Sequence, residues 1–305
     1  MTPDESRAVD EAVAVLRSGG LVGMPTETVY GLAADASNEA AVRRIFAVKG
    51  RPADHPLIVH IADATALPQW AAEVPPAAAL LAEACWPGPL TLLVPRAAHV
   101  LDVVTGGRAS VGVRVPAHPL ATELLRRFGG GVAAPSANRF GRVSPTTADH
   151  VRRDLGNDVD LVLDGGPCPV GVESTIVDCT IDPPQILRPG GIPSEQIEAL
   201  LAGRLAAAAG PSRTSGMLAS HYAPRCAVLL AADRVEAATL AHQHPGALVI
   251  GDGPDLVEYA RSLYDWLRRA DDENRPAVVA VMPPATGLGH AIRDRLVKAA
   301  ADRAG

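Results

Sequence analysis

The sequence predicts a mixed α/β protein of α+β type that contains two domains. The chain has 305 residues, which is longer than most single domains. Short β-branched runs bounded by Pro or Gly recur between residues 57 and 190, as expected for strands. Residues 226–305 instead alternate strand and helix patterns. Apolar residues make up 48% and charged residues 20% of the chain, which excludes a disordered protein.

The first of these domains is expected to hold an open twisted sheet. Asn38 can cap a helix over residues 39–48, and a second helix is expected over 118–128. The helices are expected to cluster early, and the strands to crowd between 57 and 190, which argues against a doubly wound fold. The expected strands are residues 21–24, 57–61, 90–94, 111–115, 159–166, 174–178 and 185–191.

A change of composition marks the second domain. Residues 203–224 are rich in small residues, Ser, Gly and Pro, which is typical of a linker. Strands near 226–231, 247–251 and 277–281 then alternate with helices near 233–243, 254–270 and 286–303, as in a small Rossmann-like unit. The turn Gly251–Leu256 lacks the third glycine of a dinucleotide fingerprint, so a packing or regulatory role is expected. The predicted parts are residues 1–202, 203–225 and 226–305.

Several classes of protein are excluded or disfavoured by composition. No apolar run reaches the length of a membrane span, and the polar start MTPDESRAVDEAV is not a signal or transit peptide. The four cysteines are scattered without a CxxC pair, which fits a reducing cytoplasm. Neither of the two lysines follows a glycine-rich turn, which excludes a P-loop. The net charge of −6 disfavours a protein that coats nucleic acid.

Four polar loops rich in Gly and Pro lie beside apolar strands, at residues 24–32, 48–57, 133–144 and 172–190. Lys49 stands out because the chain has only one other lysine, Lys298, and uses arginine at every other Lys or Arg position. A compact ammonium suits a phosphate or carboxylate in a tight space, although a cation at a helix C-terminus has the same pattern. Lys298, in the last helix, is expected to be solvated.

Four further residues in this region leave two readings open. Arg114 lies among valines in a strand, so it either faces solvent or meets an anion. His60 in LIVHI poses the same choice, with a histidine satisfied in place as the alternative. Ser136 and Asn138 are flanked by Ala and Pro, which admits either a ligand close to the backbone or a simple Asx or Ser turn.

The order of the motifs decides between these readings. PTETVYGL, KGRP with PLIVHI, WPGPLTLLV, VGVRVP, APSAN, and GVESTIVD with ILRPGG follow one another along residues 8–200. Together with SGMLASHYAP in the linker, they resemble the threonylcarbamoyl-AMP synthase family in its long two-domain form. The resemblance implies a YrdC-like twisted open sheet around a deep positive cavity, then a mobile linker and a small Rossmann-like domain.

The resemblance also implies an activity. The family condenses L-threonine, bicarbonate and ATP into threonylcarbamoyl-adenylate and releases pyrophosphate, with Mg²⁺ accompanying the nucleotide. The product serves the modification of adenosine 37 in tRNA, which a separate threonylcarbamoyl transferase complex completes. Three anions must meet in such a site, so fixed cations and donors have to cancel their repulsion.

Carried over residue by residue, the resemblance implies three sets of site residues. Threonine binding falls on Thr28, His60, Arg114, Ala134 and Ser174. ATP binding falls on Arg51, His55, Ser110, Ser136, Ser144, Arg188 and Tyr222. The KxR…SxN catalytic signature falls on Lys49, Arg51, Ser136 and Asn138. Glu27 and Asp54 are candidate carboxylates near the metal.

The sequence departs from the family pattern at three places, and three other functions compete with the one that the resemblance implies. His55 replaces the usual Asn, Ser110 replaces the common Thr, and Thr214–Met217 reads TSGM in place of Ser-Pro-Gly-Met. The rivals are a nucleic-acid-binding module, a carbamoyl-transfer enzyme like those in hydrogenase-maturation proteins, and a Rossmann dehydrogenase. The acidic first domain, the lack of CxxC pairs and the missing glycine fingerprint disfavour them in turn. A weak affinity for RNA stays an expectation.

Overall fold

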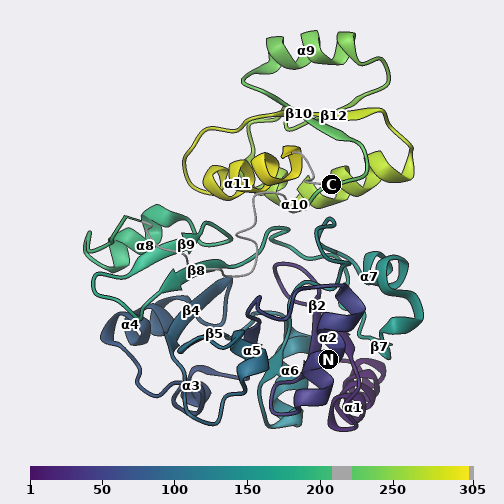
Figure 1. Cartoon of the computed structure of the whole chain (residues 1–305). Helices are drawn as coiled ribbons and strands as arrows, with labels where there is room; N and C mark the ends of the chain where they lie inside the picture. The colour runs from purple at the N-terminus through teal and green to yellow at the C-terminus, as the bar shows by residue number, and fades with distance from the viewer. Residues whose placement is uncertain (208–221, 302–305) are drawn as a thin grey trace.

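The computed structural model describes residues 1–207 and 222–301, and this part of the chain forms two β-sheets (Figure 1). The larger sheet has nine strands in the order β7-β1-β2-β6-β3-β5-β4-β8-β9. The smaller has three, in the order β10-β12-β11. The predicted mixed α/β class with a second, smaller sheet is therefore confirmed.

Parallel and antiparallel neighbours are mixed in the large sheet: β3 and β5 run parallel, whereas β4 and β5 run antiparallel. All seven predicted strands are present, but β2 and β6 were missed, because their segments are dominated by small residues. The bounds are β1 (Val22–Met24), β2 (Gly31–Asp35), β3 (Ile58–His60), β4 (Leu90–Pro95), β5 (Ser110–Arg114), β6 (Val132–Ala133), β7 (Leu161–Val162), β8 (Thr175–Asp178) and β9 (Gln185–Arg188).

The helices of this domain are spread along the chain, so the expected early clustering is wrong. They are α1 (Pro3–Arg17), α2 (Glu39–Lys49), α3 (Leu67–Trp70), α4 (Pro76–Cys85), α5 (Asp102–Thr105), α6 (Pro119–Phe128), α7 (Ala148–Leu155) and α8 (Ser194–Leu200). Helix α1 was not expected from the sequence, although its start carries a capping box. Thr2 Oγ1 accepts from Glu5 N at 3.2 Å, and Glu5 Oε2 accepts from Thr2 N at 2.6 Å.

Strand β2 shows how both faces of the large sheet are covered. Side chains alternate between the two faces of a strand. Leu32 and Ala34 accordingly belong to the hydrophobic cluster that includes α2 and α4, whereas Ala33 belongs to the one that includes α1 and α6. The sheet is therefore buried on both sides, and polar side chains on its strands need polar partners.

The second domain follows the predicted alternation of strand and helix. Its elements are β10 (Ala227–Ala231), α9 (Arg234–Gln243), β11 (Leu248–Ile250), α10 (Leu256–Asp272), β12 (Ala277–Val281) and α11 (Gly289–Ala300). All three strands are parallel, but β12 lies between β10 and β11. This order differs from the consecutive 3-2-1 order of a Rossmann half, so the likeness lies in the alternation alone.

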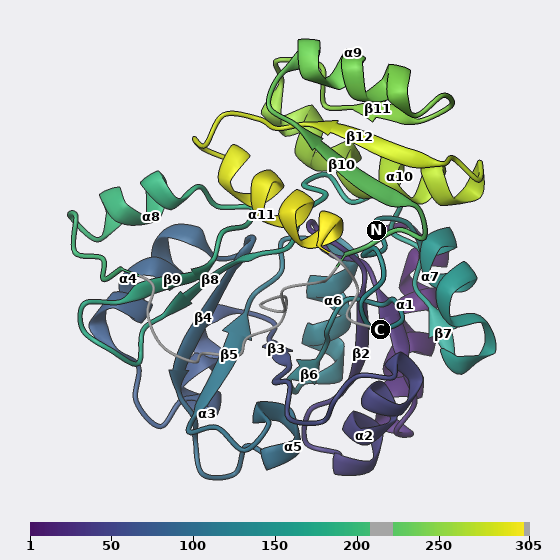
Figure 2. The same ribbon diagram turned by 45° about the horizontal axis from the view of Figure 1, so that its top comes forward.

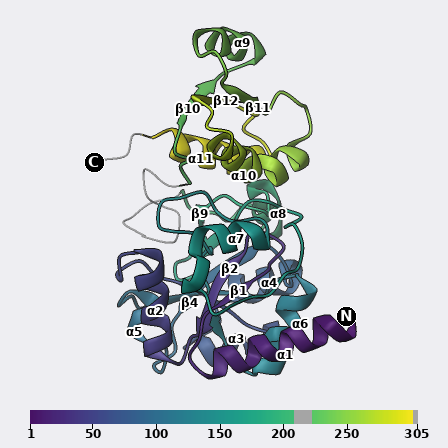
Figure 3. The same ribbon diagram turned by 90° about the vertical axis from the view of Figure 1, so that its right-hand side faces the viewer.

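Helices α10 and α11 face the large domain, and α9 lies on the far side of the small sheet (Figures 1 and 3). Figure 2 shows α11 lying over the large domain. Val143 and Val172 of the large domain share one hydrophobic cluster with Leu263 of α10 and Ile292 of α11. The two domains are thus joined by a common core as well as by polar contacts.

Two expected absences concern cysteines and membrane spans. All four cysteines are free thiols, and Cys85, Cys168 and Cys179 are buried. Within residues 1–207 and 222–301, every helix is too short or too polar to cross a membrane.

Candidate active site

Lys49 joins two of the predicted loops. It is the last residue of α2, and Gly50 ends the helix in the left-handed region at φ 64°. The Lys49 side chain is 3% exposed, and its Nζ donates to the carbonyl oxygens of Ser136 and Asn138, each at 2.5 Å. Three residues of the predicted catalytic signature therefore form one unit, although about ninety positions separate them in the chain.

Arg51 places a second buried cation near Lys49. Burial lowers the pKa of Lys49 well below its ordinary value, and the charge of Arg51 lowers it further. Burial also lowers the pKa of Arg51, to about 10. The Arg51 guanidinium donates to the carbonyl oxygen of Pro56 at 3.1 Å and lies 6.0 Å from the centre of the Phe140 ring. An anion placed between these cations would relieve their repulsion.

Thr28, His60 and Arg114 meet at one place on the large sheet. His60 on β3 and Arg114 on β5 are opposite each other in parallel register. Arg114 Nη1 donates to Thr28 Oγ1 at 2.9 Å, and Nε donates to the carbonyl oxygen of Gly88 at 3.2 Å. Arg114 is 4% exposed, so the reading in which it faces solvent is wrong.

Glu27 adds a buried carboxylate to this place. Its Oε1 lies 2.7 Å from Arg114 Nη2, and its Oε2 accepts from Ala117 N at 3.1 Å. Glu27 Oε1 and Arg114 Nη2 thus form a buried ion pair. Among the described residues, His60 Nδ1 beside them is buried without a hydrogen bond. Burial and the charge of Arg114 lower the pKa of His60 to about 3, so the ring is neutral at neutral pH.

Ser174, which directly precedes β8, is joined to Arg188 at the end of the neighbouring strand β9. Arg188 Nη2 donates to the Ser174 carbonyl oxygen at 2.8 Å and to its Oγ at 3.1 Å. The turn after Arg188 packs directly on this backbone. A Cβ at Gly190 would lie only 2.4 Å from the carbonyl oxygen of Glu173, so the turn requires glycine.

Glu173 lies between Ser144 and the second domain. Its carboxylate accepts from Ser144 Oγ at 2.7 Å, from the Tyr264 hydroxyl at 2.8 Å and from Arg295 Nε at 2.7 Å. Burial alone would raise the pKa of Glu173, but Arg295 and Arg188 outweigh it and lower the pKa to about 2. The carboxylate is therefore charged at neutral pH.

Tyr222 is the only residue of the predicted site that comes from the linker. It is 1% exposed, with φ 61°, and its ring stacks on Tyr264 at 5.7 Å between centres. The Arg295 guanidinium carbon lies 5.2 Å from the centre of the Tyr222 ring. The altered motif at Thr214–Met217 lies outside the described residues, so the predicted mobility of the linker stays a prediction.

Comparisons with known proteins show which family the chain is similar to. A family model described as "Telomere recombination" matches residues 14–190, and one described as "Threonylcarbamoyl-AMP synthase, C-terminal domain" matches residues 192–301. A threonylcarbamoyl-AMP synthase of Bacillus subtilis (strain 168) is 40% identical and covers 97% of this chain and 93% of its own length.

The chain belongs to the threonylcarbamoyl-AMP synthase family.

Two further similarities come from Pyrococcus abyssi. Its threonylcarbamoyl-AMP synthase is 41% identical over 96% of this chain and 94% of its own. The crystal structure of P. abyssi Sua5 complexed with L-threonine is 39% identical, with a TM-score of 0.90 over 97% of this chain and 94% of the other. The predicted family is confirmed over both domains, whereas the deep cavity stays a prediction.

The remaining residues that the family pattern implies lie less close to these groups. Ala134 N donates to the Ile58 carbonyl oxygen at 2.9 Å, which fixes the loop before Ser136 against β3. His55 meets the Phe140 ring edge-on at 5.6 Å. Ser110 begins the strand that Arg114 ends, about 13 Å away. Within the described part of the chain its side chain makes no hydrogen bond, so Ser110 is not joined to either group.

Sequence reasoning assigned no site residue to the second domain, yet this domain supplies Tyr264, Arg268 and Arg295. Arg295 offered a signal, because it lies on the apolar stripe of α11 between Ile292 and Ala299. The prediction that Lys298 is solvated is wrong. Its side chain is only 16% exposed and pairs with Asp294 at 2.7 Å.

Proposed function

We propose that this chain condenses L-threonine, bicarbonate and ATP into threonylcarbamoyl-adenylate and pyrophosphate. The observation that carries the proposal is the buried contact of Lys49 with the Ser136–Asn138 loop, in a chain that matches named threonylcarbamoyl-AMP synthases over nearly its full length. An amine fixed beside Arg51 suits a reaction in which several anions must be held together.

The threonine would bind at Thr28, His60, Arg114, Ala134 and Ser174. Arg114 Nη2, which pairs with Glu27 Oε1 at 2.7 Å, is a buried donor that suits the carboxylate of an amino acid. Glu27 Oε1 is a buried acceptor that suits its ammonium group, and His60 Nδ1 can bond the hydroxyl. One donor and two candidate acceptors thus match the three polar groups of L-threonine.

ATP would bind at Arg51, His55, Ser110, Ser136, Ser144, Arg188 and Tyr222. Burial lowers the pKa of Arg188, and Arg295 nearby lowers it further, as Arg188 does for Arg51. These like charges disfavour one another in a buried setting, and a triphosphate would offset that repulsion. Bicarbonate would lie near Lys49, between the amine of threonine and the α-phosphate.

The reaction has two steps in this proposal. The deprotonated threonine amine adds to the carbon of bicarbonate, water leaves, and an N-carboxylate forms. One oxygen of the N-carboxylate then attacks the α-phosphorus, the bond to the β-phosphate oxygen breaks, and pyrophosphate leaves. Lys49 and Arg51 would stabilise the charge that builds on the phosphates, without a covalent intermediate on the enzyme.

Mg²⁺ would enter as part of the MgATP substrate. Among the described residues, no group of three or more His, Cys, Asp or Glu could hold a metal ion. Of the two candidate carboxylates, Glu27 is engaged with Arg114, and Asp54 is exposed. The described residues therefore do not form a metal cage, and no step above is routed through one.

The cellular setting is also proposed. The family resemblance supports a cytoplasmic enzyme whose product passes to a separate threonylcarbamoyl transferase complex for adenosine 37 of tRNA. A weak, salt-dependent affinity for RNA would fit such a step but is not needed for synthesis of the adenylate.

An omission assay tests the proposed reaction. Pyrophosphate release is measured with L-threonine, bicarbonate and ATP together, and then with each left out in turn. Release should require all three, and mass spectrometry should detect threonylcarbamoyl-adenylate only in the complete mixture. Release that continues without threonine or bicarbonate would refute the assignment.

A further inference from the structure

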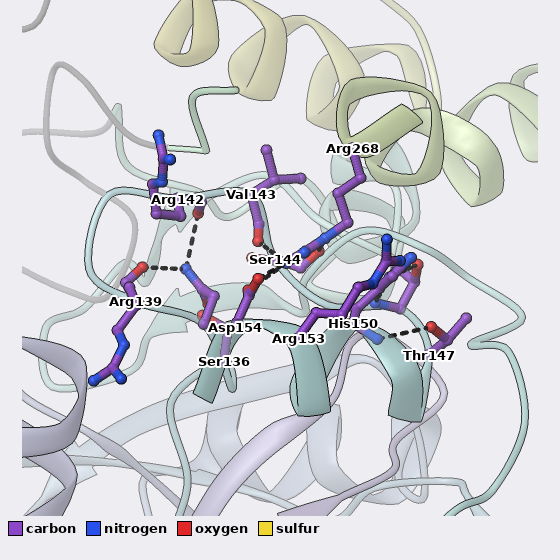
Figure 4. A network of polar contacts seen from close by, with 12 residues as sticks. Ser136, Arg139, Arg142, Val143, Ser144, Thr147, His150, Arg153, Asp154 and Arg268 are labelled. Carbon is purple, nitrogen blue, oxygen red and sulfur yellow. Dashed lines mark hydrogen bonds and ion pairs between the residues drawn. The ribbon is translucent and has the colours of Figure 1, made fainter. Parts of the chain in front are cut away.

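Residues of the second domain hold the backbone next to two of the proposed nucleotide-binding residues. Figure 4 shows Arg268 reaching from α10 to the loop that carries Ser144. Arg268 Nη2 donates to the Val143 carbonyl oxygen at 2.5 Å, and Nε donates to that of Ser144 at 3.4 Å. The same guanidinium forks onto both Asp154 carboxylate oxygens at 2.9 and 2.6 Å, which fixes its orientation.

Arg295 makes the corresponding contact on the loop that follows Arg188. Its Nη1 donates to the Pro189 carbonyl oxygen at 3.0 Å, directly after Arg188. Its Nε donates to Glu173, which also accepts from the Tyr264 hydroxyl and from Ser144 Oγ. The Arg295 side chain is fully buried, so these contacts form away from water.

The apolar packing repeats this pattern. Val143 precedes Ser144 and Val172 precedes Glu173, and both valines belong to the hydrophobic core of the second domain. Ser144 is therefore held at its hydroxyl through Glu173, at its carbonyl oxygen by Arg268, and at its neighbour by that core. The side chains of Thr28 and Arg114 are instead hydrogen-bonded within the large domain, and His60 is paired there with Arg114 in the sheet, although Val29 next to Thr28 also belongs to that core.

We infer that Tyr264, Arg268 and Arg295 are positioning residues for ATP. Glu173 transmits the effect of Tyr264 and Arg295 to Ser144, whereas Arg268 acts on the Ser144 backbone directly. The second domain then sets the geometry of the nucleotide part of the site and leaves Thr28, His60 and Arg114 in place. This inference rests on the proposed function, because it takes Ser144 and Arg188 to contact the nucleotide.

The test compares the binding of ATP and of L-threonine to the full-length chain by calorimetric titration. Tyr264→Phe removes one hydroxyl from Glu173, and Arg268→Lys keeps the charge but loses the fork. Each should weaken ATP binding about tenfold, the equivalent of one lost hydrogen bond to a charged group, with threonine binding within about twofold of wild type. Apparent KM values for ATP and threonine should split in the same way.

Arg153→Gln is the matched control. Arg153 pairs with Asp272 of α10 at 2.6 Å, so it also joins the domains, but both side chains are about half exposed. It should leave both affinities unchanged. Folded Tyr264→Phe and Arg268→Lys variants that bind ATP like wild type would overturn the inference, as would equal losses for ATP and threonine. A wild-type chain that does not bind ATP would instead refute the proposed function.

Discussion

The two parts of the candidate site are built in different ways. The threonine part, defined here as Thr28, His60 and Arg114, has two of its three residues on paired strands of one sheet. The nucleotide part, defined as Ser144, Arg188 and Tyr222, lies on loops, a strand end and the linker, against the second domain. Ladder hydrogen bonds fix a residue on a strand, whereas a loop residue depends on what packs over it.

This difference matters for how the parts respond to change. A substitution in the threonine part should act locally, because the surrounding sheet is buried on both faces. A substitution in the nucleotide part should disturb several residues at once, since the single carboxylate of Glu173 accepts from Ser144, Tyr264 and Arg295. Variants can therefore separate the two parts by which ligand they affect.

The largest effect is expected for Lys49→Arg. Lys49 links the end of α2 to the Ser136–Asn138 loop, and a longer planar guanidinium cannot reproduce two short bonds from one nitrogen. Adenylate synthesis should fall by on the order of a hundredfold or more. The sequence alone predicts little loss of stability, but the buried contacts change this expectation to a loss of about 1 to 3 kcal/mol.

Lys298→Arg is the matched control, since it makes the same change at the other lysine and should leave synthesis near the wild-type rate. Activity is measured by pyrophosphate release and stability by urea unfolding. A Lys49→Arg variant with near-normal synthesis would show that Lys49 serves only the helix end.

Arg114→Gln should give the next largest effect, and one confined to threonine. It removes the guanidinium that is proposed to hold the carboxylate of threonine. Such a loss costs about 2 kcal/mol or more, which corresponds to roughly thirtyfold weaker threonine binding. Calorimetric titration should find ATP binding almost unchanged. A similar loss for both ligands would mean that the two parts are not separable.

The same contrast explains what could be predicted from the sequence. His60 and Arg114 lie in β-branched strands whose alternation is local, so their elements were predicted correctly. The strands β2 and β6 were missed because small residues give little strand signal, and α1 was missed despite its capping box. The family motifs supplied the proposed residues of the large domain.

The contacts of the second domain could not be predicted in this way. Arg295 and Glu173 are 122 positions apart, and no local pattern states which buried arginine meets which carboxylate. The order of the small sheet was equally hidden, because alternation of strand and helix is compatible with several parallel orders. Packing between elements decides which distant charges and strands pair. The periodicity of a single element does not predict that packing.

A smaller effect is expected from the pH dependence of stability. The pKa of His60 is about 3 in the folded protein, below its ordinary value of 6.5, so only the unfolded chain takes up this proton as pH falls below 6.5. Stability should therefore decrease from pH 7.5 to 5.5, with about 1.4 kcal/mol of the decrease due to His60. His60→Asn should remove that share in urea unfolding at the two pH values. Equal decreases in both proteins would contradict a buried neutral His60.

The smallest effect is expected for His55→Asn, which restores the residue that is usual in the family. His55 touches the Phe140 ring edge-on, and its side chain is 15% exposed. Loss of the ring contact should cost about 0.5 to 1 kcal/mol of stability. ATP affinity should change by less than about threefold, which corresponds to a change in binding free energy of under 1 kcal/mol. Phe140→Leu removes the same contact from the other side and should give a similar loss of stability.

The His55→Asn variant therefore tests whether residue 55 belongs to the nucleotide part. If His55→Asn altered ATP affinity tenfold while Phe140→Leu did not, residue 55 would touch the nucleotide directly. The loop that carries Arg51 would then belong to the nucleotide part through two side chains. If both variants changed stability alone, His55 would not contact the nucleotide. The nucleotide part would then reach this loop only through Arg51, which donates to the Pro56 carbonyl oxygen within the same loop. The second outcome is expected, because a mostly buried ring held against Phe140 has little freedom to follow a ligand.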